Sequence, residues 1–180
     1  MVDSDKFPVS GKAVGKTSKT VLADSNFNRD KNKKFSIIDT VGFDDPKKNT
    51  SKYTIAELVA TLKQRVDFIN TFIIAVNGTN KRIDKSLLTT LNLFQKMFGE
   101  EFWNQAIIVF TYLSMDEKAV TKRKQINKMT DDEWANEYLR ELQNEIPACG
   151  GKLKHLFLDS IYTKEDEEEG RFIKLELNFE

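Results

Sequence analysis

An aspartate and a glycine follow a short apolar run in the first third of the sequence. The run is Phe35–Ile38, and Asp39-Thr40-Val41-Gly42 comes directly after it. A buried strand that ends on aspartate places a carboxylate at the edge of a sheet, where it can hold Mg²⁺ beside a phosphate. A glycine three residues later lets a backbone N–H approach the phosphate, because no Cβ stands in the way. The pattern D-x-x-G is short, and the alternative is a strand that simply runs into a turn.

A second candidate for phosphate binding is Gly15-Lys16-Thr17. A phosphate-binding loop reads G-x-x-x-x-G-K-[ST] between a strand and a helix. Here Ser10 stands where the first glycine belongs, no apolar strand precedes the motif, and no helical stripe follows it. We interpret the string as part of a Lys-rich surface loop, or as a switch segment in which Thr17 or Thr20 contacts the Mg²⁺ of a nucleotide. A kinase or ATPase that uses Lys16 is a third alternative, which Lys16→Ala would test.

The composition predicts one globular domain. The chain has 180 residues, of which 39% are hydrophobic and 31% are charged, and 28 Lys and Arg balance 28 Asp and Glu. This balance gives no support to nucleic-acid binding. The single cysteine, Cys149, excludes an intramolecular disulfide and indicates a reducing compartment, so we expect a cytoplasmic protein. The sequence has no apolar stretch of the ~18 residues that a transmembrane helix needs, and residues 1–12 lack the apolar core of a signal peptide.

Apolar periodicity predicts alternating strands and helices. Four segments have the apolar character of buried strands: residues 35–40, 71–76, 106–110 and 155–159. Three others carry an apolar stripe of helical period: residues 54–69, 83–98 and 130–146. Residues 163–178 are predicted as a final helix, and the charged segment 114–128 as a solvated helix face or insert. Thr54 and Thr130 are predicted N-caps with a glutamate three residues later, and Gly99 is predicted to end the second helix.

This alternation predicts an α/β fold with three layers, in which a parallel sheet carries helices on both faces. Ligands in such folds bind beyond the carboxyl ends of the strands. Four dipeptides occupy these ends: Asp39-Thr40, Asn77-Gly78, Thr111-Tyr112 and Asp159-Ser160. Neither His155 nor Cys149 has a partner that would make a catalytic pair, so no catalytic residue is predicted.

Several strings together resemble one family. They are FSIIDTVGFDDP, NTFIIAVNGTNKRIDKSLLTTLNLFQKMFGEEFWNQAIIVFT, DDEWANEYL and HLFLDSIY. Over residues 7–177 the chain resembles the avirulence-induced (AIG-type) or GIMAP G domains, an immunity-associated nucleotide-binding family related to the chloroplast import receptor GTPases. The resemblance implies a P-loop NTPase-like fold that binds GTP or GDP together with Mg²⁺.

On the phosphate side, the resemblance assigns roles to five residues. Asp39, Thr40 and Gly42 would belong to the D-x-x-G element that senses the γ-phosphate. Thr17, with Thr20 as the alternate, would lie in the switch segment before it. Thr17 and Asp39 would contact Mg²⁺, in part indirectly.

On the base side, the resemblance assigns five more residues. Thr111 would open the guanine-recognition loop, although the segment lacks the Lys and Asp of the usual [NT]-K-x-D pattern. Tyr112 would stack on the base or, alternatively, pack on a neighbouring helix. Asp116 is a candidate for the carboxylate that reads the base, and Asp159 and Ser160 would lie near the last base-contacting turn.

The family's first strand, phosphate loop and first helix have no counterpart in residues 1–180. We therefore expect a single, N-terminally truncated G domain over 1–180, with a switch-like loop region at 7–34 and a core at 35–180. GTP binding is expected to be weak or absent and hydrolysis negligible. The alternative is a nucleotide-independent protein-interaction module built on a degenerate G domain. The resemblance also implies association of copies into a homo-oligomer through G-domain faces.

Overall fold

The computed structural model describes residues 20–26, 30–40, 50–151 and 153–159. The chain divides into two compact units, Met1–Ile69 and Asn70–Glu180, and each is described by itself. The predicted final helix at 163–178 lies outside the described residues. A single domain over 1–180, with its loop region and core, stays a prediction.

The first unit contains an antiparallel hairpin of strands β1 (Val21–Asn26) and β2 (Lys34–Asp39), with Val21 opposite Asp39. The Asp30 carboxylate helps to form the turn, because its Oδ1 accepts a hydrogen bond from the Asn32 N–H at 2.9 Å. The Ser36 hydroxyl donates to Asp24 Oδ1 across the strands, at 2.6 Å.

Two expectations for this unit are wrong. The strand predicted at 35–40 exists, but it pairs with β1 rather than joining the parallel sheet, and it is not buried, since Ile37 is 40% exposed. Helix α1 spans Thr50–Arg65, so Thr54 lies inside the helix and is not its N-cap. Strand β1 lies within the segment 7–34, for which a switch-like loop region was predicted.

The second unit is built on a parallel sheet in the order β3 (Phe72–Asn77), β4 (Ala106–Thr111) and β5 (Lys154–Phe157). Phe72 lies beside Ala106, and Ile108 lies beside His155. The strands are connected by helices: α2 (Lys85–Phe98), α3 (Phe102–Gln105), α4 (Glu117–Asn127) and α5 (Asp131–Glu145), with a 3-10 turn at Pro147–Cys149. An α/β fold with a parallel sheet flanked by helices is confirmed.

Local signals set the ends of the helices. Asp84 caps α2 by accepting from the Ser86 N–H at 3.0 Å, and Gly99 ends α2 with φ 77°, a conformation that glycine adopts readily. Thr130 and Glu133 form a reciprocal capping box at the start of α5, with bonds of 3.2 and 2.7 Å. The predictions for Gly99 and Thr130 are confirmed.

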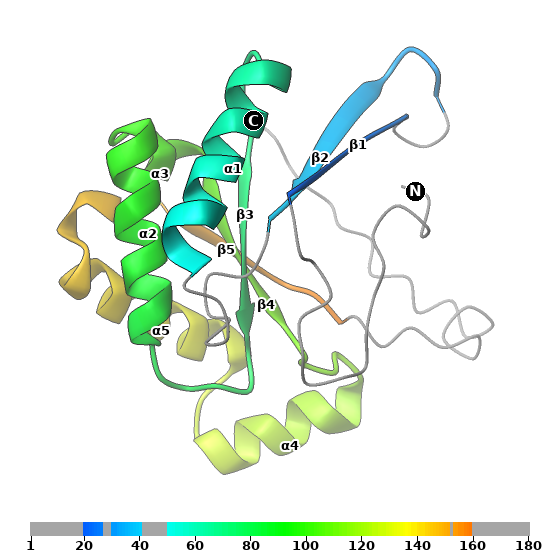
Figure 1. Ribbon diagram of the computed structural model, residues 1–180. Coiled ribbons are helices and arrows are strands. Elements are labelled where there is room, and N and C mark those ends of the chain that lie inside the picture. Colours follow the sequence, from blue (N-terminus) through cyan, green and yellow to red (C-terminus); the bar gives the residue numbers. More distant parts are fainter. Residues whose placement is uncertain (1–19, 27–29, 41–49, 152, 160–180) are drawn as a thin grey trace. The chain divides into compact units, whose positions relative to one another are not determined.

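The core of this unit lies between one face of the sheet and helices α2, α3 and α5, as Figure 1 shows. Its largest fully buried side chains come from the sheet, from these helices and from the 3-10 turn: Leu91, Phe102, Trp103, Ile108, Phe110, Leu142 and Cys149. On the opposite face exposure is uneven, since Ile73 is 71% exposed and Val109 is 8% exposed. Helices on both faces of the sheet stay a prediction.

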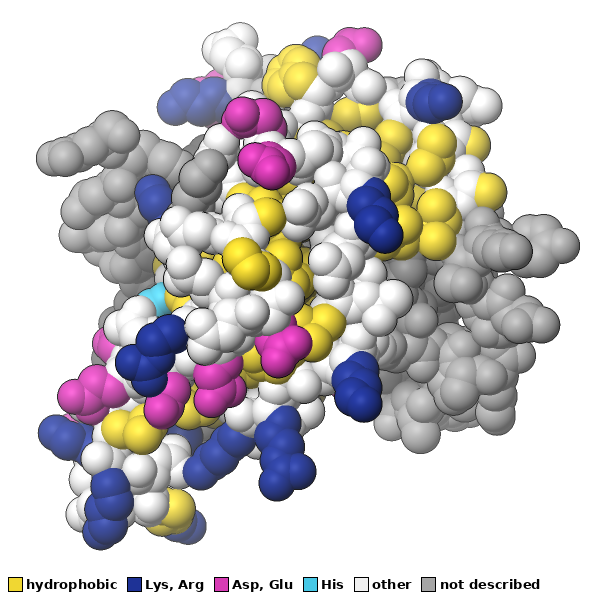
Figure 2. Space-filling model, turned by 90° about the vertical axis from the view of Figure 1, so that its left-hand side faces the viewer, with side chains coloured by type: hydrophobic (Ala, Val, Ile, Leu, Met, Phe, Trp, Pro, Cys, Tyr) yellow, Lys and Arg dark blue, Asp and Glu magenta, His cyan; other side chains and the backbone are white. Residues whose placement is uncertain are grey.

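Charged side chains of both signs are interspersed on the left-hand side of the molecule, which faces the viewer in Figure 2. Neither sign dominates this side, in agreement with the balanced composition. Among the described residues, no helix is both long enough and apolar enough to cross a membrane.

Candidate functional site

The loops that follow β3 and β4 lie against each other at the carboxyl edge of the sheet. The Gly78 N–H donates to the Thr111 carbonyl at 2.8 Å, and the Thr111 hydroxyl donates to the Val76 carbonyl at 3.2 Å. A Cβ on Gly78 would lie only 2.5 Å from Leu113 Cδ1. Glycine is therefore required here for close packing of the two loops.

The β3 loop is also held from within. Asn77 Oδ1 accepts from the Thr79 N–H at 3.0 Å and from the Thr79 hydroxyl at 2.7 Å. The Asn80 N–H donates to the Asn77 carbonyl at 3.0 Å. These local bonds form a compact Asx-type turn directly after the strand.

Tyr112 is the most exposed aromatic residue at this edge. It is 66% exposed and its φ is 61°, in the left-handed region that non-glycine residues rarely adopt. The alternative prediction was that Tyr112 packs on a neighbouring helix. About two-thirds of the residue is open to solvent, so it is not packed beneath a helix. Such a conformation costs of order 1 kcal/mol and marks a candidate functional position. Base stacking by Tyr112 stays a prediction.

Asp116 caps helix α4. Its Oδ1 accepts from the Ala119 N–H at 2.9 Å, and its Oδ2 accepts from the Ser114 hydroxyl. Both bonds favour the ionised carboxylate, so they lower the pKa of Asp116 below its usual value, with the Ser114 bond as the larger cause. The carboxylate thus already has a structural role, and its predicted role in reading the base is not tested.

Asp159 connects the end of β5 to the loop after β4. Its Oδ2 accepts from the Met115 N–H at 3.0 Å, and the neighbouring Leu158 N–H donates to the Phe110 carbonyl at 2.9 Å. Thr111, Tyr112, Asp116 and Asp159 therefore share one edge of the sheet, as expected from the parallel topology. Ser160 lies outside the described residues.

Arg123 fixes the same loop, and the sequence did not single it out. Its Nη1 donates to the Ser114 carbonyl at 2.6 Å, while Nε and Nη2 donate to the Asp131 carboxylate at 3.0 and 2.6 Å. Hydrogen bonding to Asp131, followed by the nearby charges of Asp116 and Asp159, raises the pKa of Arg123. One sequence feature could have indicated this role: Arg123 is an arginine in a lysine-rich segment. Arginine can bind a carboxylate through two N–H groups at once, and lysine cannot.

The phosphate-side residues belong to the first unit. Asp39 ends β2 opposite Val21, and Thr40 follows it; Thr20 directly precedes β1. Thr17 and Gly42 lie outside the described residues. The D-x-x-G assignment stays a prediction.

The described residues do not make a Mg²⁺ site on their own. They contain no group of three His, Cys, Asp or Glu side chains placed to hold a metal. Magnesium bound with a nucleotide needs one or two protein oxygens besides the phosphates, and of the two predicted ligands only Asp39 is described.

His155 and Cys149 have structural roles. The His155 ring packs against Phe110 and Phe157, with centroids 6.2 and 5.5 Å apart, and its Nε2 lies 3.3 Å from Asp132 Oδ1. Cys149 is buried, and burial raises the pKa of its thiol. Such a thiol is a poor nucleophile.

Comparisons with known proteins agree with this fold. The sequence matches the AIG1 family over residues 2–169. Among solved structures, Toc33 from Arabidopsis thaliana in complex with Mg²⁺ and GMPPNP is similar, with a TM-score of 0.57 and 15% identity over 82% of this chain. A dimerization-deficient mutant of the same protein gives a TM-score of 0.59 and 13% identity over 84% of this chain.

This chain spans 60% of the length of either Toc33 structure. At such low identity the likeness shows the fold alone. A search of curated protein sequences gives no significant match. The family match covers nearly the whole sequence, so the chain belongs to the AIG1 family and has the α/β fold of GTP-binding G domains.

Proposed function

We propose that this chain binds guanine nucleotides at the carboxyl edge of β3, β4 and β5. The observation that carries the proposal is the convergence of Thr111, Tyr112 and Asp159 at this edge in a chain of the AIG1 family. The GIMAP subgroup and a cytoplasmic location are part of the proposal and rest on the sequence alone.

The base would stack on Tyr112. An aromatic side chain that stacks on a base contributes about 1–3 kcal/mol to binding. The loop that carries this tyrosine is fixed by two hydrogen bonds, from the Gly78 N–H to the Thr111 carbonyl and from the Met115 N–H to Asp159 Oδ2. Base binding therefore costs little conformational entropy in this loop.

The phosphates would be held more weakly than the base. The 180 residues contain no G-x-x-x-x-G-K-[ST] pattern. Each missing hydrogen bond to a charged phosphate removes about 1.5–3 kcal/mol. We therefore propose that these 180 residues bind GTP and GDP with Kd weaker than about 100 μM, and that GTP hydrolysis is negligible.

A titration of the full chain with fluorescent mant-GDP in the presence of Mg²⁺ tests the proposal, with NMR shifts to locate the site. Resonances of residues 111–116 should move, and Tyr112→Ala should weaken binding about fivefold or more. Ile126→Ala is a matched control, because Ile126 on α4 is also 66% exposed. Unchanged resonances at 111–116 would contradict the guanine site. A Kd for mant-GDP in the low micromolar range would contradict the proposal that the phosphates are bound weakly.

A second candidate function is nucleotide-independent association of copies through the sheet. Ile73 on β3 is 71% exposed and Leu158 after β5 is 42% exposed. The mass of the chain by light scattering, with and without GTP, separates the two functions. Assembly that ignores GTP and is lost in Ile73→Lys, but not in Ile126→Lys, would favour the interaction module.

A further inference from the structure

A small cavity lies between helix α5, the end of α4 and the loop after β3. Its volume is about 180 Å³, and none of its lining residues belongs to segment 111–116 or to Asp159. A cavity needs only ~10–15 Å³ to admit one water molecule, so this one can take a larger group. Its lining residues come from these three elements and from the connection between α4 and α5: Lys81, Asn127, Met129, Trp134, Glu137, Tyr138 and Glu141.

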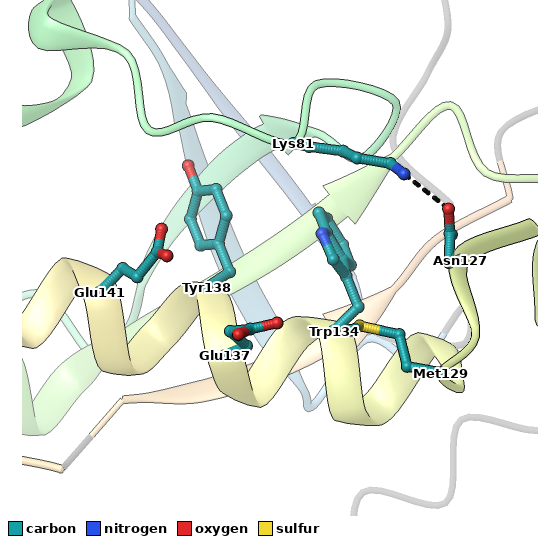
Figure 3. Close-up of a pocket in the computed structure, with 7 residues that line it drawn as sticks. All are labelled: Lys81, Asn127, Met129, Trp134, Glu137, Tyr138 and Glu141. Carbon is teal, nitrogen blue, oxygen red and sulfur yellow. Dashed lines mark hydrogen bonds between the residues drawn. The ribbon is translucent and has the colours of Figure 1, made fainter.

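Two aromatic rings line the cavity from α5, as Figure 3 shows. Trp134 and Tyr138 lie one helical turn apart, with ring centroids 5.8 Å apart and tilted by 50°. Aromatic faces attract cations, and Arg in particular stacks on them.

Tyr138 lines the cavity, and its hydroxyl is not among the fully buried polar atoms. The residue is 3% exposed, and its hydroxyl makes no hydrogen bond to any residue that the structure describes. Burial, followed by the charges of Asp84 and Glu141, raises the pKa of Tyr138 to about 12. The hydroxyl therefore stays protonated at neutral pH, in a negative environment, with an oxygen that can accept from a cationic N–H.

The charges around the cavity are divided between its two ends. Lys81 donates its ammonium hydrogen to Asn127 Oδ1 at 2.6 Å, and in Figure 3 it points toward Asn127 and away from Glu141. Glu137 and Glu141 lie four residues apart on α5, an arrangement in which like charges repel. Arg140 lies 3.5 Å from Glu137, but both side chains are largely exposed, so this pair contributes little. A cation between the two carboxylates would relieve their repulsion.

We propose that this cavity binds a guanidinium group, stacked on Trp134 and hydrogen-bonded to the Tyr138 hydroxyl and the carboxylates of Glu137 and Glu141. The group is the side chain of an arginine, supplied by a partner protein or by a small molecule. The site is separate from the proposed nucleotide site and does not depend on it.

The test is an NMR titration of the isotope-labelled full chain with N-acetyl-L-arginine amide. The chain has two tryptophans, and their indole N–H signals report on different places. The Trp134 signal should move and saturate. The Trp103 signal should stay, because Trp103 is fully buried and donates to Gln95 Oε1 at 3.2 Å. N-acetyl-L-citrulline amide, which has the same shape without the charge, should bind at least about fivefold more weakly.

Variants on α5 locate the site. Glu141→Gln and Tyr138→Phe should each weaken arginine amide binding about two- to fivefold. Glu145→Gln is the matched control, because this exposed glutamate on the same helix does not line the cavity. Thermal melts should show that Tyr138→Phe is as stable as the parent, since removing an unpaired hydroxyl costs little.

A tripeptide with a central arginine and free L-arginine, compared side by side, separate the two sources. Tighter binding of the blocked tripeptide assigns the group to a partner protein, and tighter binding of the free amino acid assigns it to a small molecule. Equal binding of citrulline and arginine amides, an unmoved Trp134 signal, or an equal loss in Glu145→Gln would each overturn the proposal.

Discussion

Replacing Gly78 with alanine should destabilise the second unit through one steric contact. The new Cβ would lie 2.5 Å from Leu113 Cδ1, 2.7 Å from Leu113 Cγ and 3.1 Å from the Thr111 carbonyl oxygen. Leu113 is 6% exposed, so it has little room to withdraw. The backbone cannot move away freely either, because the Gly78 N–H donates to Thr111 at 2.8 Å.

The expected cost is that of inserting one methyl group into a packed site, about 1–3 kcal/mol. Leu113→Ala removes the two closest of the three nearest atoms, and the Thr111 carbonyl oxygen at 3.1 Å stays. By itself Leu113→Ala should cost about 2–5 kcal/mol as a large-to-small change. In that background, however, Gly78→Ala should cost less than about 1 kcal/mol, because the steric conflict is gone.

Urea unfolding of the four proteins of this double-mutant cycle measures the coupling. Leu142→Ala replaces Leu113→Ala in a control cycle, since Leu142 is fully buried on α5 and is not among the atoms nearest to Gly78. The control cycle should be additive. If Gly78→Ala has the same cost, within about 0.5 kcal/mol, in the parent and in the Leu113→Ala background, the steric explanation is wrong.

Three further predictions concern single side chains. The pKa of Asp116 is lower in the folded chain than in the unfolded chain. The ionised carboxylate therefore stabilises the fold at pH above its unfolded pKa, and this stabilisation is lost as pH falls through its folded pKa. Asp116→Asn lacks this carboxylate, so below pH ~4 its melting temperature should fall less steeply than that of the parent. Thr130→Ala should cost about 1 kcal/mol in urea unfolding, while Thr130→Ser should retain most of the cap; equal losses would argue against the capping box. Cys149 is 1% exposed and its thiol pKa is raised by burial, so iodoacetamide should label it only as fast as the protein opens, and immediate labelling of the folded chain would contradict its burial.

Segments with strong apolar periodicity were predictable. Strands β3 and β4 and helices α2 and α5 match their predicted ranges to within two residues, because burial of one continuous face decides their structure. The placement of loop residues such as Tyr112 and Asp159 at one edge followed from the parallel topology.

Features that depend on pairing across the chain were not predictable. Strand β1 is polar beyond Ala23, and it forms because it pairs with β2. Arg123 looked like one more surface charge until the fold placed Asp131 beside it. The capping of α4 by Asp116 was not singled out in the sequence, and its predicted role in base reading stays a prediction. The phosphate-side assignment of Asp39 rests on family resemblance and stays a prediction.

Four phenylalanines of the second unit cluster within a short stretch of chain. The Phe72 ring lies 4.9 Å from Phe98 and 4.8 Å from Phe102, and Phe94 stacks on Phe98 at 5.9 Å. All of these contacts close loops of about 30 residues or fewer, which cost little chain entropy and form quickly. During synthesis on the ribosome, β3 and α2 can therefore collapse around these rings before β5 has emerged. The later strand would then add to a preformed template rather than nucleate the sheet.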